Sequence, residues 1–173
     1  SQDAGLGETA IVALVPEAEP VVGGWRRVHT DDGRRGMPAH VTVLSPFVDD
    51  SVAADRIAAV RRTVSAFAPF DCAFAETARF AGDVLYLRPE PDEIFRAMTA
   101  AIVHAFPDFP PYSGLHDDAV PHLTVVESDD HEALVATELE LRDRLPIGTW
   151  VSAVSLMHLV DGRWREHTSV PLG

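Results

Sequence analysis

The sequence predicts an α+β fold that is internally duplicated, and three observations lead to this prediction. The chain has 173 residues, of which 46% are hydrophobic, which is enough for one domain with a sizeable core. Short β-branched runs that are typical of strands alternate with stretches of helical periodicity. The same order of elements occurs twice, and each copy begins with a His-apolar-Thr-apolar strand. We therefore expect a single domain over residues 9–173 that is made of two pseudo-symmetric lobes.

The N-terminal half is expected to begin with a buried strand at residues 9–15. The next segment, residues 16–37, is rich in proline, glycine and charge, and favours a loop or a short irregular helix. Asp49, Asp50 and Ser51 offer N-caps for the helix that follows, because their side-chain oxygens can accept from the free N–H groups of a first turn. The other elements expected in this half are a strand at 40–47, that helix up to about residue 67, and a strand pair at 70–80 and 84–88.

The C-terminal half repeats this order. A Pro/Gly-rich loop at residues 107–121 leads into its His-x-Thr strand. Residues 128–130 are expected to cap the next helix, and the sequence Pro-Ile-Gly at residues 146–148 is expected to break it. The elements expected here are a helix at 91–106, a strand at 122–127, a helix up to residue 145, and a hairpin of strands at 151–160 and 164–170.

The repeat places four polar side chains at matching positions. Residues two apart in a strand share a face, so His40 and Thr42 point to one side of their strand. His122 and Thr124 do the same in the second copy. If the strands of two antiparallel sheets meet inside and the helices lie outside, both imidazoles reach one central cleft.

Composition excludes several kinds of chemistry. All 14 basic residues are arginine, so there is no lysine for a Schiff base, a phosphate-binding Gly-Lys-Ser/Thr loop or nucleotidyl transfer. The single cysteine, Cys72, allows no internal disulfide, and its apolar surroundings predict a buried thiol. The net charge of −13 predicts weak or no binding to long nucleic acid, although a small anionic substrate can still enter a locally positive pocket.

The sequence also bears on location and assembly. No apolar run approaches the length of about 20 residues that a membrane span requires. No signal peptide is visible either. We therefore expect a cytoplasmic protein that makes no contact with a membrane, and we expect a monomer.

The paired motifs resemble those of the 2H phosphoesterase superfamily. They read His-Val-Thr-Val from His40 and His-Leu-Thr-Val from His122, about 80 residues apart. Pro-Ala before the first motif, Pro-Phe after it and the Pro-Pro-Tyr-x-Gly loop before the second are also similar. From about residue 9 to 170, the chain looks like the branch of bacterial 2′-5′ RNA ligases and 2′,3′-cyclic phosphodiesterases.

The resemblance implies a role for each motif residue. His40 and His122 would be the catalytic pair, and no metal or cofactor would be needed. Thr42 and Thr124 would bind the phosphate. The chemistry agrees, because histidine, with an ordinary pKa of about 6.5, can serve as a base or as an acid near neutral pH.

Two further residues are candidates for substrate binding. Tyr112, in the Pro/Gly loop, can stack on a nucleobase. Four arginines lie between residues 26 and 35, just before the first motif. One of them can reach the substrate phosphate, because a guanidinium group matches phosphate geometry, and we name Arg35 as the candidate; a solvated loop is the alternative, and the sequence does not distinguish among the four arginines.

These observations favour a metal-independent phosphodiesterase that hydrolyses the 2′,3′-cyclic phosphate of a nucleotide or of a short RNA end. Three alternatives remain open. One is 2′-5′ RNA ligation, which is the same chemistry in reverse, and another is a non-catalytic nucleotide-binding module. The third is a metal-dependent hydrolase that would use His116, Asp117, Asp118 and His122 as its ligands.

Overall fold

Two antiparallel sheets of four strands each form the framework of the computed structural model, which describes residues 8–48, 53–81, 83–108 and 120–173. The first sheet has the strand order β2-β1-β7-β8, and the second has the order β5-β4-β3-β6. The strands of the first sheet are β1 (Thr9–Leu14), β2 (His40–Leu44), β7 (Ala153–Val160) and β8 (Arg163–Pro171). Those of the second are β3 (Phe70–Phe80), β4 (Val84–Glu90), β5 (Leu123–Glu127) and β6 (Ile147–Val151). The α+β class and the two antiparallel sheets of the prediction are therefore confirmed.

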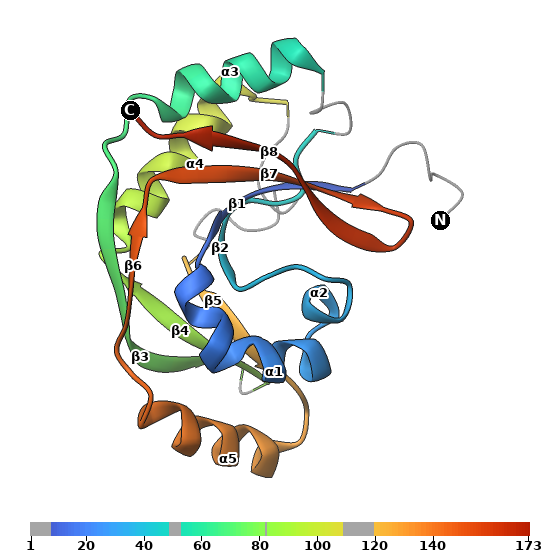
Figure 1. Ribbon diagram of the computed structural model, residues 1–173, viewed down its shortest axis with the longest axis vertical. Coiled ribbons are helices and arrows are strands. Elements are labelled where there is room, and N and C mark those ends of the chain that lie inside the picture. The colour runs from blue at the N-terminus through green and yellow to red at the C-terminus, as the bar shows by residue number, and fades with distance from the viewer. Residues whose placement is uncertain (1–7, 49–52, 82, 109–119) are drawn as a thin grey trace.

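Helices join the strands and pack on both sheets (Figure 1). Helix α4 contacts β2 and α3 contacts β8, whereas α1 contacts β5 and α5 contacts β3. The apolar side chains of α4 that are buried recur at helical spacing, as Phe95, Met98 and Ile102. The helical elements are η2 (Pro16–Ala18), α1 (Glu19–His29), α2 (Asp31–Arg34), α3 (Ala54–Val64), α4 (Glu93–Ala105) and α5 (His131–Arg142).

The two halves of the repeat exchange their hairpins. The hairpin β3–β4 follows the first His-x-Thr strand in sequence, but it pairs with β5, the strand of the second motif. The hairpin β7–β8 follows the second motif, but it pairs through β1 with β2. The motif strands β2 and β5 lie at the edges of their sheets and contact each other. Pattern alone could not show this exchange, because strand partners are chosen by packing between distant segments.

One extended run passes from sheet to sheet. The sequence predicted a helix break at residues 146–148 and one strand from residue 151 onward. The structure instead begins β6 at Ile147, pairs it with β3, and starts β7 in the other sheet after Ser152. In Figure 1 this run turns sharply between β6 and β7, so that it forms a corner between the sheets. Gly148 weakened the strand signal, since glycine is rare in strand interiors.

The core determines which face of each motif strand is free. A large apolar cluster takes side chains from both sheets, among them Ile11 and Val41 of the first and Val125 of the second. His40 pairs across the strands with Leu14, and Thr42 pairs with Val12. Directly opposed residues share a face of the sheet, so these polar side chains lie on the face opposite to Val41.

Four details complete the comparison with the sequence. Segment 16–37 contains a regular helix of 11 residues, α1, and not only a loop. The cap expected before α5 is confirmed, because the Asp130 carboxylate accepts from the N–H of Ala133. Helix α3 has Ala53 as its N-cap, and residues 49–51 lie outside the described part of the chain. Cys72 is buried as expected, and burial raises the pKa of its thiol to about 11.

Among the described residues, no helix has the length and apolar character needed to cross a bilayer.

Candidate active site

The two histidines are held in the same way by their own backbones. Nδ1 of His40 lies 2.7 Å from the carbonyl oxygen of Pro38, and Nδ1 of His122 lies 2.6 Å from that of Val120. A carbonyl oxygen can only accept, so each Nδ1 carries the proton and donates it. In the neutral imidazole, Nε2 then has its lone pair available. Both rings are therefore prepared to accept a proton at Nε2, and the same tether fixes their orientation.

Both motifs line a single cavity of about 190 Å³. Its walls come from β2 and from the start of β5, with contributions from α1, α2 and the ends of the two motif strands. The threonine side chains are only half-buried, so their hydroxyls can reach a ligand. The lining residues are Arg26, Thr30, Asp32, His40, Thr42, Ser45, His122, Thr124 and Glu127. The structure thus brings together the four motif residues that the sequence singled out.

His40 is the more deeply buried of the two histidines, with 7% of its surface exposed. Burial, assisted by the nearby Arg26 guanidinium, lowers the pKa of His40 to about 3. The hydrogen bond to the Pro38 carbonyl acts in the opposite direction but is weaker. His40 is therefore neutral throughout the ordinary working range of pH.

His122 has different neighbours. The ring of Phe80 meets it edge-to-face at 4.9 Å between centroids, and Tyr86 lies at 5.5 Å. Phe80 and Tyr86 stack on each other at 4.1 Å. Burial lowers the pKa of His122, while the Val120 carbonyl and the Glu127 carboxylate raise it. His122 is only half-buried and faces an anion, so it is easier to protonate than His40.

Arg26 connects the two motifs. Its side chain is 1% exposed, and Nη1 donates to the carbonyl of Thr124 at 2.8 Å. Nη2 donates to the carbonyl of Met37 at 3.0 Å and, at 3.4 Å, to that of Pro38, which also holds His40. Burial lowers the pKa of Arg26, and the carboxylates of Asp32, Glu19 and Glu127 oppose this effect. A single guanidinium group therefore fixes the backbones of both His-x-Thr strands.

The other predicted binding residues lie elsewhere. Arg35 is exposed, with Nε 3.5 Å from a carboxylate oxygen of Asp31, and it does not line the cavity. Tyr112 lies outside the described residues, as do three of the four residues proposed as metal ligands, residues 116–118. Within the described part of the chain, no three His, Cys, Asp or Glu side chains are grouped as they would be around a metal ion.

Sequence reasoning missed three residues of the cavity for which a signal existed. Ser45 and Glu127 each follow their motif histidine by five positions, so the repeat itself marks them as a matched pair. Arg26 lies four residues after the buried Val22 in α1, which places both on the inner face of the helix. That signal was lost because the segment was not expected to form a regular helix.

Comparison with known proteins identifies relatives of this chain. The family described as the 2′-5′ RNA ligase superfamily matches residues 14–163. No curated protein matches the sequence. Among solved structures, LigT of Escherichia coli without ligand is 15% identical, with a TM-score of 0.59, over 96% of this chain and 97% of LigT.

Two further structures show the same fold. TT0787 of Thermus thermophilus is 14% identical, with a TM-score of 0.60, and the match covers 95% of this chain and 97% of that one. Escherichia coli LigT in complex with 3′-AMP is 14% identical, with a TM-score of 0.57, and covers 95% of each chain. The similarity extends over nearly the whole chain, so both sheets take part in it.

Proposed function

This chain belongs to the 2′-5′ RNA ligase superfamily, a group of 2H phosphoesterases, and we propose that it hydrolyses the 2′,3′-cyclic phosphate of a nucleotide or a short RNA end without a metal ion. Membership supports phosphoesterase or ligase activity. The complex of LigT with 3′-AMP supports a small nucleotide as the ligand. The proposal depends above all on one observation. Two imidazoles with the same Nδ1 tether share a cavity with two threonine hydroxyls.

The proposed reaction is an in-line displacement at phosphorus. A water oxygen forms a new bond to phosphorus while the bond to one ribose oxygen breaks. One imidazole takes a proton from the water at Nε2, and the other gives a proton to the leaving ribose oxygen. The product is a phosphomonoester with a free hydroxyl, and a second proton exchange with solvent restores both imidazoles.

The surroundings of the two histidines favour a division of roles. His40 stays neutral because it is buried beside Arg26, so its Nε2 is free to accept the proton of water, although the lowered pKa also makes it a weaker base. His122 is less buried and lies near Glu127, so it is suited to carry the proton for the leaving oxygen. A bound phosphate anion would assist, because a nearby negative charge raises the pKa of an imidazole.

The threonines and Arg26 have supporting roles in this proposal. The hydroxyls of Thr42 and Thr124 would donate to the non-bridging phosphate oxygens, where charge must be held in phosphoryl transfer. Arg26 would add positive potential to the cavity wall while it keeps the two strands in place. A single donor of this kind is worth about 10² to 10³ in rate in an acyl-transfer site.

The decisive experiment follows the four nucleoside 2′,3′-cyclic monophosphates by phosphorus NMR in the presence of EDTA. We expect turnover in the wild type and a loss of about 10²- to 10⁴-fold in His40→Ala and His122→Ala. His158→Ala is the matched control, because His158 lies on β7 outside the cavity lining. Turnover that requires a metal would contradict the proposal, and so would full activity in either motif variant. The product isomer would show which ester bond breaks.

A further inference from the structure

A second cavity, of about 450 Å³, lies between α1, α2 and the first residue of β8. Its charged lining residues are Arg26, Arg27, Arg34, Arg163 and Glu19, and we call it the arginine pocket. Four arginines against one glutamate give it a positive local charge, whereas the whole chain carries −13. Arg26 also lines the cavity of the two histidines, so the two cavities are neighbours across one side chain.

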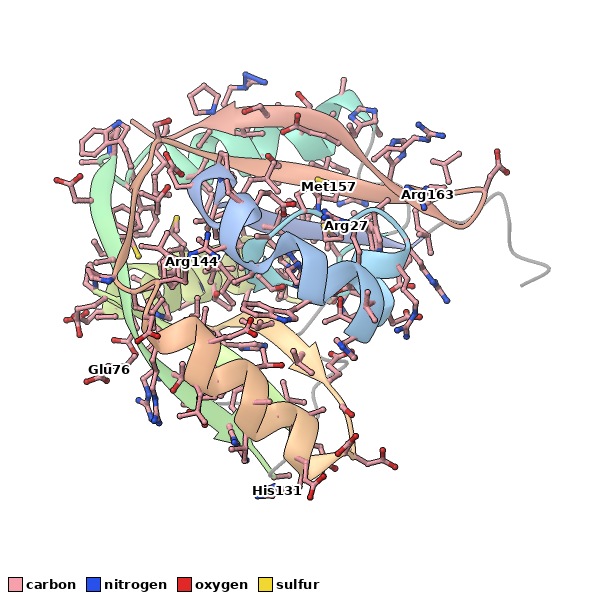
Figure 2. The ribbon with its side chains drawn as sticks, turned by 60° about the horizontal axis from the view of Figure 1, so that its bottom comes forward. Arg27, Glu76, His131, Arg144, Met157 and Arg163 are labelled. Atoms are coloured by element: carbon pink, nitrogen blue, oxygen red, sulfur yellow. The ribbon has the colours of Figure 1, made fainter. Side chains whose placement is uncertain are left out.

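Glycines keep space for the guanidinium groups in this pocket. A Cβ atom at Gly36 would lie 2.8 Å from Nη2 of Arg163, and Gly36 has a φ of +92°, which L side chains rarely adopt. A Cβ atom at Gly23 would lie 2.7 Å from Oε1 of Glu19 and 3.0 Å from Nη1 of Arg27, so this glycine leaves room for the pair of them. Figure 2 labels two of the three exposed arginines of the pocket, Arg27 on α1 and Arg163 at the β7–β8 turn.

Hydrogen bonds join the two sides of the pocket, α2 and β8, and they use only some of the guanidinium N–H groups. The N–H of Trp164 donates to the carbonyl of Arg35 at 2.8 Å, which ties β8 to the end of α2. Arg163 donates through Nη1 to the carbonyl of Arg34 at 3.2 Å. A guanidinium group has five N–H donors, so these contacts leave others for a ligand. Glu19, the acidic residue that lines the pocket, already has partners. Its carboxylate accepts from the N–H of Ala39 and lies 3.7 Å from Nη1 of Arg27.

We propose that the arginine pocket binds a second phosphate group, separate from the one that reacts between the two histidines. Arginine forks match phosphate oxygens in pairs, and the pocket gathers several such forks in an otherwise acidic molecule. This second phosphate can be the one that joins the terminal nucleotide of a short oligonucleotide to its neighbour, or it can be a free phosphate ion. The first of these sources rests on the proposed function, whereas the anion site itself does not.

Calorimetric titration with inorganic pyrophosphate at low salt tests the site. The wild type is expected to show a binding event that weakens at least about tenfold in the double variant Arg27→Ala/Arg163→Ala, which corresponds to about 1.4 kcal/mol. The matched control is Arg61→Ala/Arg144→Ala, which removes the same charge from exposed positions outside the pocket. An equal loss in both double variants would indicate net charge alone and would overturn the proposal. Binding unaffected by Arg27→Ala/Arg163→Ala would overturn it as well.

Kinetics distinguish the two sources of phosphate. If the phosphate belongs to the substrate, Arg27→Ala/Arg163→Ala raises KM for a dinucleotide with a 2′,3′-cyclic end by a larger factor than KM for the mononucleotide. If it is free, added phosphate changes mononucleotide turnover in the wild type, and this response weakens in the double variant. If no substrate turns over, the proposed function fails, while the pyrophosphate titration still decides whether the anion site exists.

Discussion

The two His-x-Thr motifs have the same backbone geometry but different surroundings. In each, Nδ1 of the histidine donates to a carbonyl two residues upstream, and a threonine follows two residues downstream. The neighbours differ, however. His40 is buried beside the cation of Arg26, whereas His122 touches the aromatic rings of Phe80 and Tyr86 and lies near the anion of Glu127.

This difference shows which elements of a duplicated fold give its two histidines different surroundings. The repeat supplies two equivalent imidazoles, but a reaction that needs one base and one acid requires them to titrate differently. Arg26 comes from α1, and the aromatic pair comes from β3 and β4, so other elements supply the distinction. The matched positions Ser45 and Glu127 add a further difference within the repeat itself. Four experiments can break or sharpen this comparison.

Removal of either imidazole is expected to have the largest effect. His40→Ala and His122→Ala should each reduce kcat/KM for a cyclic mononucleotide by about 10²- to 10⁴-fold. The double variant should be little worse than the poorer single variant, because residues that act as a unit are not additive. Steady-state kinetics of the three variants measures this. Losses that multiply would mean that the histidines act independently.

Replacement of Arg26 should disturb the His40 side more than the His122 side. Arg26→Met leaves the carbonyls of Met37 and Thr124 without this donor, which should lower the free energy of unfolding by about 1–3 kcal/mol. It also removes a cation that lowers the pKa of His40, so that pKa should rise, although burial keeps it below the ordinary value. Urea unfolding and NMR titration of the imidazoles measure the two effects. Arg61→Met, on the exposed surface of α3, is the control, and equal destabilisation by both variants would contradict the bridging role.

The change in the free energy of unfolding as the pH falls should show that His40 is buried in its neutral form. The unfolded chain takes up a proton at this histidine below about pH 6.5, whereas the folded protein resists until about pH 3. Between these values His40 therefore lowers the free energy of unfolding by about 1.4 kcal/mol for each unit that the pH falls. His40→Asn keeps an N–H for the Pro38 carbonyl but does not titrate, so its stability should decline less over this range. Parallel curves for variant and wild type in urea unfolding would show that His40 is not held neutral.

The smallest effect is expected from Glu127→Gln. The Glu127 carboxylate raises the pKa of His122, so its removal should lower that pKa and leave the pKa of His40 almost unchanged. In the proposed mechanism, kcat/KM falls when His122 loses its proton, so this upper limb should move to lower pH. NMR titration and the pH dependence of kcat/KM measure the shift. Ser45→Ala, at the matched position of the first motif, is the control. If the upper limb of the pH profile of kcat/KM did not move, Glu127 would not be raising the pKa of His122.

Sequence pattern was sufficient to predict those strands and helices whose formation depends on interactions between residues close together in the chain. The hairpin at residues 70–90, the two motif strands and the capped helix α5 were anticipated, because alternation and capping act over a few residues. The gathering of His40, Thr42, His122 and Thr124 at one cavity also followed, since a repeat implies matching faces.

What could not be predicted depends on contacts between distant segments. The buried position of Arg26 depends on α1 contacting β5; the spacing from Val22 indicates the face of the helix on which Arg26 lies, but not the strand that covers that face. Both arginines precede the first motif, but Arg26 lies on the buried face of α1, whereas Arg35 follows α2 and is exposed. The pKa of His40 falls because its surroundings are closed by elements far away in the chain, which is a property of packing and not of the motif.

The exchange of hairpins has a consequence for synthesis on the ribosome. β1 contains Thr9 and β7 contains its partner His158, so the sheet that carries the first motif is held together by strands that lie far apart in sequence. Such long-range pairing is slow, because a large loop must close before any contact forms. Translation delivers β7 and β8 after the other strands of both sheets, so the strand of His40 lacks its complete sheet until this hairpin emerges. The sheet that carries His40 can therefore be completed only after β8 has emerged, and truncation of this hairpin should impair the half of the site that carries His40, although the hairpin follows the second motif in sequence.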